Sequence, residues 1–289
     1  MKIVGHSNLI PNLIRDLAFT AIPNDVTLIE VGSPLPADCD RRKCIWIGDN
    51  VSPEAVIGLN VDSGVGHVVN VNGVNVRSEL SAAIRMIYET EQFFRDPVKC
   101  ILGTPPTQPP LQLAFTAAVE KAPTIDAIRN FVTTIPFSKS VVDDIVVVAD
   151  ELFTNAVFNA PHHKGQEMVD SLLRAPSVSL QKGKTGRFLI GNSDDCIVLT
   201  CEDPFGTLNP QAVAARIQRC FREGVSASIN MGIGTYMVYT LAVSLYIIVN
   251  CGVCSQVSCV FPLKKSLRSI SALSRNIHIA VIGGSNGIP

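Results

Sequence analysis

Charged residues are scarce in this chain of 289 residues: they make up 17% of it, whereas hydrophobic residues make up 47%. That balance excludes a long disordered chain and predicts well-packed globular structure. Lysine and arginine form no long run, and the formal net charge is -1. The electrostatic footprint of a nucleic-acid-binding protein is therefore missing, and we expect no nucleic-acid partner.

Targeting signals and membrane-length apolar runs are scarce as well. Residues 1–10 lack a basic start followed by an apolar run and a small-residue cleavage site, which argues against a signal peptide. Residues 235–249 are strongly apolar, but they are fewer than the ~20 residues of a membrane-spanning helix and include Thr240 and Ser244. The sequence therefore predicts a soluble, cytoplasmic protein without membrane contact.

The nine cysteines lack the paired spacing of a complete zinc site. Without a secretory signal, they predict reduced thiols that serve as small buried hydrophobic groups. Cys251 and Cys254 form one CxxC pair followed by Cys259, but no second CxxC or HxxxH pair accompanies them. A cysteine-lined hairpin turn is the preferred interpretation, and a metal or redox site is the alternative.

Four prolines within residues 103–110 divide the chain. Proline fixes φ and removes a backbone donor, so this segment predicts a stiff, extended linker without helix or central strand. Residues 1–102 are then expected to form one domain and residues 111–289 another, each long enough to bury its own core.

Strands and helices alternate in the first of these domains. The expected strands are residues 2–4, 26–31, 44–47, 56–59 and 67–71, and the expected helices are residues 8–19 and 79–94. Such alternation predicts an α/β domain with a parallel sheet that helices cover on both sides.

This order resembles the receiver domain of response regulators over most of residues 1–98. Asp49 follows the third expected strand, where a receiver carries its phosphorylated aspartate. The partners of that chemistry are missing, because Gly5-His6-Ser7 stands in place of paired acids, and Asn70 and Asn72 in place of a lysine. We interpret Asp49 as a loop residue and the domain as a degenerate receiver that serves as a docking module.

Beyond the linker the order changes. The expected helices are residues 125–134, 139–160, 211–221 and 234–244, and the expected strands are residues 187–190 and 196–201 with a terminal hairpin of 246–250 and 257–262. Helices on one face of a mixed sheet predict an α/β sandwich.

The long helix carries Asp150-Glu151-Leu152-Phe153-Thr154-Asn155-Ala156. Glu151, Asn155 and Asn159 are four residues apart and so share one helix face. An amide oxygen suits Mg²⁺, and a carboxylate one turn earlier can align or deprotonate an attacking group. An ordinary polar helix face is the alternative.

Asp203-Pro204-Phe205-Gly206 ends an apolar strand. A carboxylate at a strand end can accept a hydrogen bond from the amino group of adenine, and a wrong base would leave it unpaired. A simple turn, in which Gly206 supplies a positive φ, is the alternative.

Gly232-Ile233-Gly234 opens the apolar helix. Glycines let the backbone approach phosphates, and the free amides at a helix start bind anions. Residues 209–230 would then form a mobile lid over the phosphates. Its Arg216, Arg219 and Arg222 could each meet phosphate charge, with a solvated helix face as the alternative.

In this order, the three segments resemble the N box and two glycine boxes of the Bergerat-type ATP-binding domain found in gyrase, heat-shock chaperones, histidine kinases and MutL. The resemblance covers about residues 110–270 and is greatest to bacterial anti-sigma-factor-like ATPases. It implies Glu151 as the catalytic base and Asn155 as the Mg²⁺ ligand. The cofactor-binding residues that it implies are Asn155, Asp203, Gly206, Gly232, Gly234 and Ser255.

The function implied by the resemblance is that of a serine/threonine protein kinase or ATPase that uses ATP and Mg²⁺. Its partner would be a sigma factor, an anti-anti-sigma factor or another signalling protein, and a homodimer stays open. Phe205 and Thr207 replace the usual glycines of the first glycine box, and Phe158 replaces a basic residue. His162 and His163 lie beyond the helix, so histidine autophosphorylation is not expected. An inactive adaptor of two degenerate signalling domains is the alternative.

Overall fold

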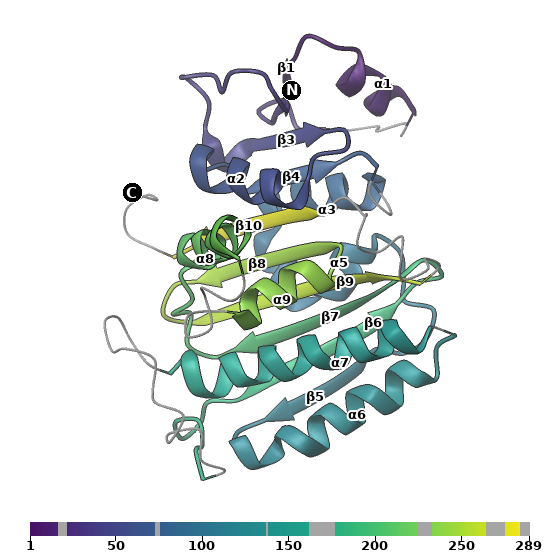
Figure 1. Ribbon diagram of the computed structural model, residues 1–289, viewed down its shortest axis with the longest axis vertical. Coiled ribbons are helices and arrows are strands. Elements are labelled where there is room, and N and C mark those ends of the chain that lie inside the picture. Colours follow the sequence, from purple (N-terminus) through teal and green to yellow (C-terminus); the bar gives the residue numbers. More distant parts are fainter. Residues whose placement is uncertain are drawn as a thin grey trace.

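The computed structural model describes residues 1–16, 22–72, 76–136, 138–161, 177–224, 233–263 and 275–283. They form a mixed α/β structure around one large central sheet (Figure 1). The described strands follow the order β1-β2-β3-β4-β10-β8-β9-β7-β6-β5. They are β1 (Lys2–Val4), β2 (Thr27–Glu30), β3 (Cys44–Gly48), β4 (His67–Asn70), β5 (Leu111–Phe115), β6 (Gly186–Asn192), β7 (Cys196–Asp203), β8 (Ser244–Asn250), β9 (Cys254–Pro262) and β10 (Asn276–Ile282).

Helices cover both faces of this sheet. They are α1 (Leu9–Asp16), α2 (Pro53–Ser63), α3 (Val76–Tyr88), α4 (Thr90–Arg95), α5 (Pro97–Leu102), α6 (Lys121–Thr133), α7 (Lys139–Thr154), α8 (Pro210–Glu223) and α9 (Ile233–Leu241). On the face toward the viewer of Figure 1, α2, α8, α9, α7 and α6 each pack against the next. This row of helices crosses from the first half of the chain into the second.

The first four strands are parallel, as the alternation of strands and helices predicts. All five residues of β3 are buried, because both faces of a parallel sheet are covered. Trp46 packs in one hydrophobic cluster with Val56 of α2. Ile45 packs in the other with Ile10 of α1. Successive residues of β3 thus serve opposite layers.

Two expectations for the first half are wrong. A receiver-type sheet has the order 2-1-3-4-5 with its first strand inside, whereas β1 lies at the edge of this sheet. The expected strand at residues 56–59 lies within α2. Ser52 caps that helix by accepting a hydrogen bond from Ala55 N at 3.2 Å, and Pro53 occupies its first position. A short apolar run did not reveal this, because a buried helix and a buried strand share it.

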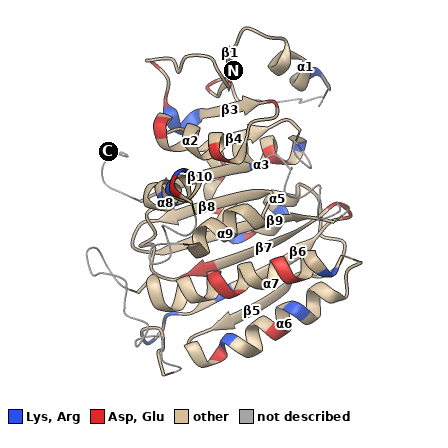
Figure 2. Ribbon diagram, viewed as in Figure 1, with Lys and Arg blue, Asp and Glu red and all other residues tan. Residues whose placement is uncertain are grey.

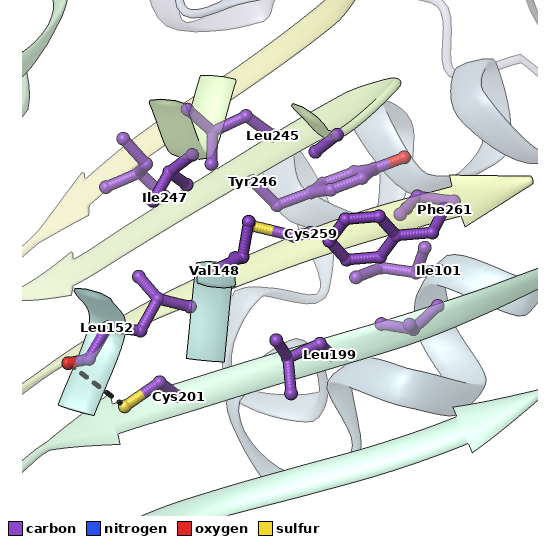
Figure 3. Close-up of a cluster of buried hydrophobic side chains, with 14 of the residues drawn as sticks. Ile101, Val148, Leu152, Leu199, Cys201, Leu245, Tyr246, Ile247, Cys259 and Phe261 are labelled. Atoms are coloured by element: carbon purple, nitrogen blue, oxygen red, sulfur yellow. Dashed lines mark hydrogen bonds between the residues drawn. The ribbon is translucent and has the colours of Figure 1, made fainter. Parts of the chain in front are cut away.

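In the second half, β5, β6, β7, β9 and β8 form antiparallel pairs. Figure 3 shows how α7 is seated on them: Val148 and Leu152 lie in a buried cluster with Leu199 and Cys201 of β7. With β10 parallel to β8, the sheet of this half is mixed, as predicted. The helix expected at residues 234–244 ends at Leu241, and Ser244 already belongs to β8.

Strand β10 joins the two halves and was not predicted. It runs parallel to β8 and antiparallel to β4, so a single sheet continues from one half into the other. Hydrophobic burial there is interrupted by Glu79 of α3, which is 6% exposed. Glu79 accepts hydrogen bonds from Ser244 and Tyr246, both at 2.5 Å, and its Oε2 lies 3.1 Å from His278 Nε2. We call these side chains the seam cluster.

Residues 103–110 contain no helix or strand, as their prolines predict, and Thr107 N donates to Asn192 O at 2.8 Å. The division into domains at this segment stays a prediction. Among the described helices, none has the length and hydropathy needed to cross a membrane. Cys251 lies in the turn between β8 and β9, Cys254 begins β9 and Cys259 is buried within it. The predicted cysteine-lined hairpin is thus present.

Candidate functional site

The polar face of α7 forms a chain of side chains that continues into η3 (Asn155–Asn159). Asn155 Nδ2 donates to Glu151 Oε1 at 3.0 Å, and Asn159 Nδ2 donates to Asn155 Oδ1 at 2.5 Å. The backbone widens here, because Ala160 N bonds Asn155 O at 2.9 Å across one residue more than an α-helix spans. Such local widening is frequent at functional sites.

Neighbouring elements fix α7 in place. In Figure 2, α7 carries acidic residues and lies next to α6, which carries both basic and acidic residues. Lys121 Nζ lies 2.9 Å from Asp150 Oδ2, and Arg129 pairs with Asp143 at 3.4 Å. These pairs are partly exposed, so they orient the helix more than they stabilise it. On the buried side, Cys201 Sγ donates to Leu152 O at 3.7 Å.

Gly234 presses directly against Glu151. A Cβ atom at Gly234 would lie 1.9 Å from Glu151 Cδ, so only a glycine leaves this carboxylate in place. Beside the contact is a cavity of about 330 Å³ between α7 and α9, lined in part by Val147, Asp150 and Met237. Gly232, the other glycine of this box, lies outside the described residues.

Asp203 ends β7 beside Ser255 of β9, its partner in the strand register. Its Oδ1 accepts hydrogen bonds from Phe205 N at 2.9 Å and Gly206 N at 3.3 Å. Burial raises the pKa of Asp203, while hydrogen bonds from Phe205 N, Ser255 and Gly206 N act in the opposite direction. Ser255 is 1% exposed, and its Oγ accepts from Leu208 N at 3.4 Å.

Gly206 has a φ of 64°, in the left-handed region that favours glycine. A Cβ atom there would lie 2.1 Å from Asn250 O. The loop after Asp203 is therefore folded tightly against the β8–β9 turn. The turn interpretation of Gly206 expects this backbone conformation.

The end of η3 and the loop after Asp203 touch each other. Thr207 Oγ1 donates to Ala160 O at 2.6 Å, and η3 packs against β7. The structure thus brings Glu151, Asn155 and Gly234 to one end of α7 and places the Asp203 loop beside that end.

Other predicted positions lie elsewhere. Residues 210–223 of the expected lid form α8, on which Arg216, Arg219 and Arg222 are exposed. Asp49 is an exposed bend residue that accepts a hydrogen bond from Asn72, in agreement with its interpretation as a loop residue. His162 and His163 lie outside the described residues.

Sequence reasoning missed Lys184 at the site. Its Nζ donates to Pro204 O at 2.8 Å and lies 5.8 Å from the centre of the Phe205 ring. It therefore places a positive charge beside the Asp203 loop. No pattern marked it, because an isolated lysine in a polar turn looks like any solvated residue.

No family model and no curated protein matches this chain. Among solved structures, one chain of the crystal structure of the SiaB-SiaC complex from Pseudomonas aeruginosa is a weak neighbour, with 13% sequence identity and a TM-score of 0.37. The match covers 62% of the present chain and 98% of that chain. A similarity this low does not establish a common fold.

Proposed function

We propose that the protein binds ATP with Mg²⁺ at the end of α7 and acts on a protein partner as a serine/threonine kinase or an ATPase. The observation that carries this proposal is the meeting of the three sequence motifs around one helix end. Gly234 is packed on Glu151, and Thr207 bonds the Asp203 loop to Ala160. Segments far apart in the sequence thereby meet along the last turn of α7 and η3.

The side chains at this helix end fit a magnesium ion and a triphosphate. Asn155 Oδ1 and the Glu151 carboxylate are oxygen donors on successive turns, the ligand type that Mg²⁺ prefers. Asn155 would hold the ion, and the start of α9 at Ile233 would direct its backbone amides toward the phosphates. ATP with Mg²⁺ supplies the phosphoryl group that is transferred.

Asp203 and Ser255 suit recognition of the adenine. Two backbone amides bond Oδ1 of Asp203 and Ser255 adds a further hydrogen bond, but a carboxylate offers about four acceptor positions, so it can still accept from a ligand. Because Asp203 is partly buried, a base without a matching donor would leave this acceptor unpaired. The Asp203 carboxylate would therefore favour adenine, which has an amino group to donate, over bases that lack such a donor.

In the proposed reaction, Glu151 acts as the base. Its hydrogen bond with Asn155 and its contact with Gly234 hold the carboxylate beside the cavity between α7 and α9. A serine, threonine or water hydroxyl that enters from this cavity would attack the γ-phosphorus of ATP and pass its proton to Glu151, and ADP would leave with the bridging oxygen.

Calorimetric titration with ATP and MgCl₂ tests the proposal. Asp203→Ala is expected to weaken binding by roughly tenfold or more, since a hydrogen bond to a charged group is lost. Glu151→Ala should bind ATP but lose turnover. Asp194→Ala, in an exposed turn, is the matched control and should bind like the wild type. Equal affinities for the Asp203 and Asp194 variants would refute the adenine contact.

An adaptor without catalysis is the second candidate, and one observation favours it. The amide of Asn155 is bonded on both sides, to Glu151 and to Asn159, so this polar chain is satisfied by the protein alone. The adaptor predicts no saturable ATP binding by the wild type in the same titration. Saturable binding that requires Mg²⁺ would decide against it.

A further inference from the structure

Tyr239 of α9 contacts two other helices at once. Its hydroxyl donates to Pro53 O, in the first residue of α2, at 2.8 Å. Its ring meets Phe221 of α8 edge-on, with centroids 6.2 Å apart and planes at 89°. The side chain of Tyr239 is 1% exposed, while Pro53 and Phe221 are partly exposed. Tyr239 therefore joins α9, the helix that carries Gly234, to α2 and α8.

The helices α2 and α8 also touch each other directly. They pack side by side, and Gln218 of α8 is 7% exposed within this contact. A methyl group added at Gly58 of α2 would lie only 3.7 Å from Gln218 Nε2. The expected lid helix of the nucleotide site thus rests on the first half of the chain.

Both ends of α2 are tied to the parallel strands. Before its start, Asn70 Nδ2 of β4 donates to Val51 O at 2.8 Å. In its last turn, Ser63 Oγ accepts a hydrogen bond from Trp46 Nε1 of β3 at 3.0 Å. A shift of α2 therefore changes the surroundings of Trp46.

We propose that Tyr239 is a positioning residue, through which α2 sets the place of α9 and so the nucleotide affinity of the site. The inference rests on the proposed function and adds its regulation by the first half of the chain. The coupling is reciprocal, because a state of α2 that favours nucleotide binding must in turn be favoured by the nucleotide. The differential contact is the hydrogen bond from Tyr239 to Pro53, which holds only when α9 and α2 are in register.

Trp46 is the one tryptophan of the sequence, so its fluorescence reports on α2 in the intact protein. The full-length chain is titrated with ATP and MgCl₂ while binding is followed by calorimetry and Trp46 emission by fluorescence. The wild type should bind and change its emission. Tyr239→Phe should raise Kd roughly two- to tenfold, the range for one lost hydrogen bond, and reduce the emission change.

Tyr236→Phe is the matched control. Tyr236 lies on the same helix and also packs on Phe221, with centroids 5.0 Å apart. No hydrogen bond joins its hydroxyl to any other residue that the structure describes. This variant should keep the wild-type Kd and emission change. A second variant, Gln218→Ala, weakens the contact of α8 with α2 and should also reduce the emission change, so the test does not depend on Tyr239→Phe folding.

The outcomes separate this inference from the proposed function. Binding without any change in Trp46 emission overturns the coupling and leaves the nucleotide site standing. Equal behaviour of Tyr239→Phe and Tyr236→Phe overturns the positioning role of the hydroxyl. Absence of binding by the wild type overturns the proposed function and the inference together.

Discussion

The molecule holds two polar clusters that differ in burial. In the seam cluster, Glu79 and His278 are almost fully buried, and Glu79 contacts three polar groups. At the end of α7, Glu151 and Asn155 form a similar chain but remain partly open to the surface. Both clusters are ordered by hydrogen bonds, but only the second lies where a ligand can reach it.

This difference separates a structural use of polar residues from a functional one. Leaving a buried donor without an acceptor is costly, so the seam cluster fixes how β4, β10 and β8 meet. Next to His278, burial lowers the pKa of His67 well below its usual value, and His278 lowers it further. The open cluster stays near water and can exchange its partners. We therefore expect substitutions in the first to affect stability and those in the second to affect binding.

The largest effect is expected for Glu79→Ala. The substitution leaves Ser244, Tyr246 and His278 without their common partner and should lower the free energy of unfolding by about 3–5 kcal/mol. Urea denaturation followed by Trp46 fluorescence measures it. Glu54→Ala, at an exposed position of α2, is the control and should change stability little. A small loss for Glu79→Ala would show that the seam is not held by its polar groups.

The seam could not be predicted from the sequence. Glu79 and His278 are 199 positions apart, and no local pattern pairs them. β10 reads Asn-Ile-His-Ile-Ala-Val-Ile, an apolar run whose partner strands are chosen only in the folded chain. The short strand β5 was not predicted either, because its pairing with β6 is also made only in the folded chain. The local periodicity of a sequence can indicate a strand, but it does not indicate which other strands that strand pairs with.

The polar face of α7 was predictable, because it depends only on helix period. Glu151, Asn155 and Asn159 recur every four residues and do form a bonded row. The contact of Gly234 with Glu151 depends on tertiary structure, and only the order of the motifs suggested it. Tyr239 gave no signal, since an aromatic residue in an apolar helix usually belongs to the core.

Gly206 and Gly234 of the candidate site are expected to differ in the same way, one in stability and the other in activity. Gly206→Ala places a methyl group against the backbone oxygen of Asn250 at a positive φ, so it should destabilise the protein by about 2–4 kcal/mol. Gly234→Ala meets only the flexible end of Glu151, which can turn away. It should cost less than about 1 kcal/mol and instead lower ATP turnover. Thermal unfolding and ATPase assays on both variants measure the contrast.

Equal stability losses in the two glycine variants would mean that the Glu151 side chain yields no more easily to a new methyl group than the backbone oxygen of Asn250 does. The double variant Gly234→Ala with Glu151→Ala checks the cause. It removes the carboxylate that the new methyl group would meet, so it should be no less stable than Glu151→Ala alone.

The smallest effect concerns Asp203, whose pKa is raised by burial. A carboxyl group whose folded-state pKa exceeds its unfolded value contributes its full stability at low pH and loses that contribution as the pH rises through the folded value. Asp203→Asn keeps an oxygen for Phe205 N and Gly206 N but carries no charge. Relative to wild type, the variant should gain stability, by less than about 1 kcal/mol, as the pH rises from 4 toward neutrality.

Denaturation curves for Asp203→Asn and wild type at a series of pH values measure this difference. Asp194→Asn, in an exposed turn, is the matched control and should show no such trend. A wild type that instead gains stability over Asp203→Asn as the pH rises would mean that the hydrogen bonds of the charged form outweigh its burial. Asp203 would then belong with the satisfied groups of the seam cluster, because its acceptors would already be engaged within the protein.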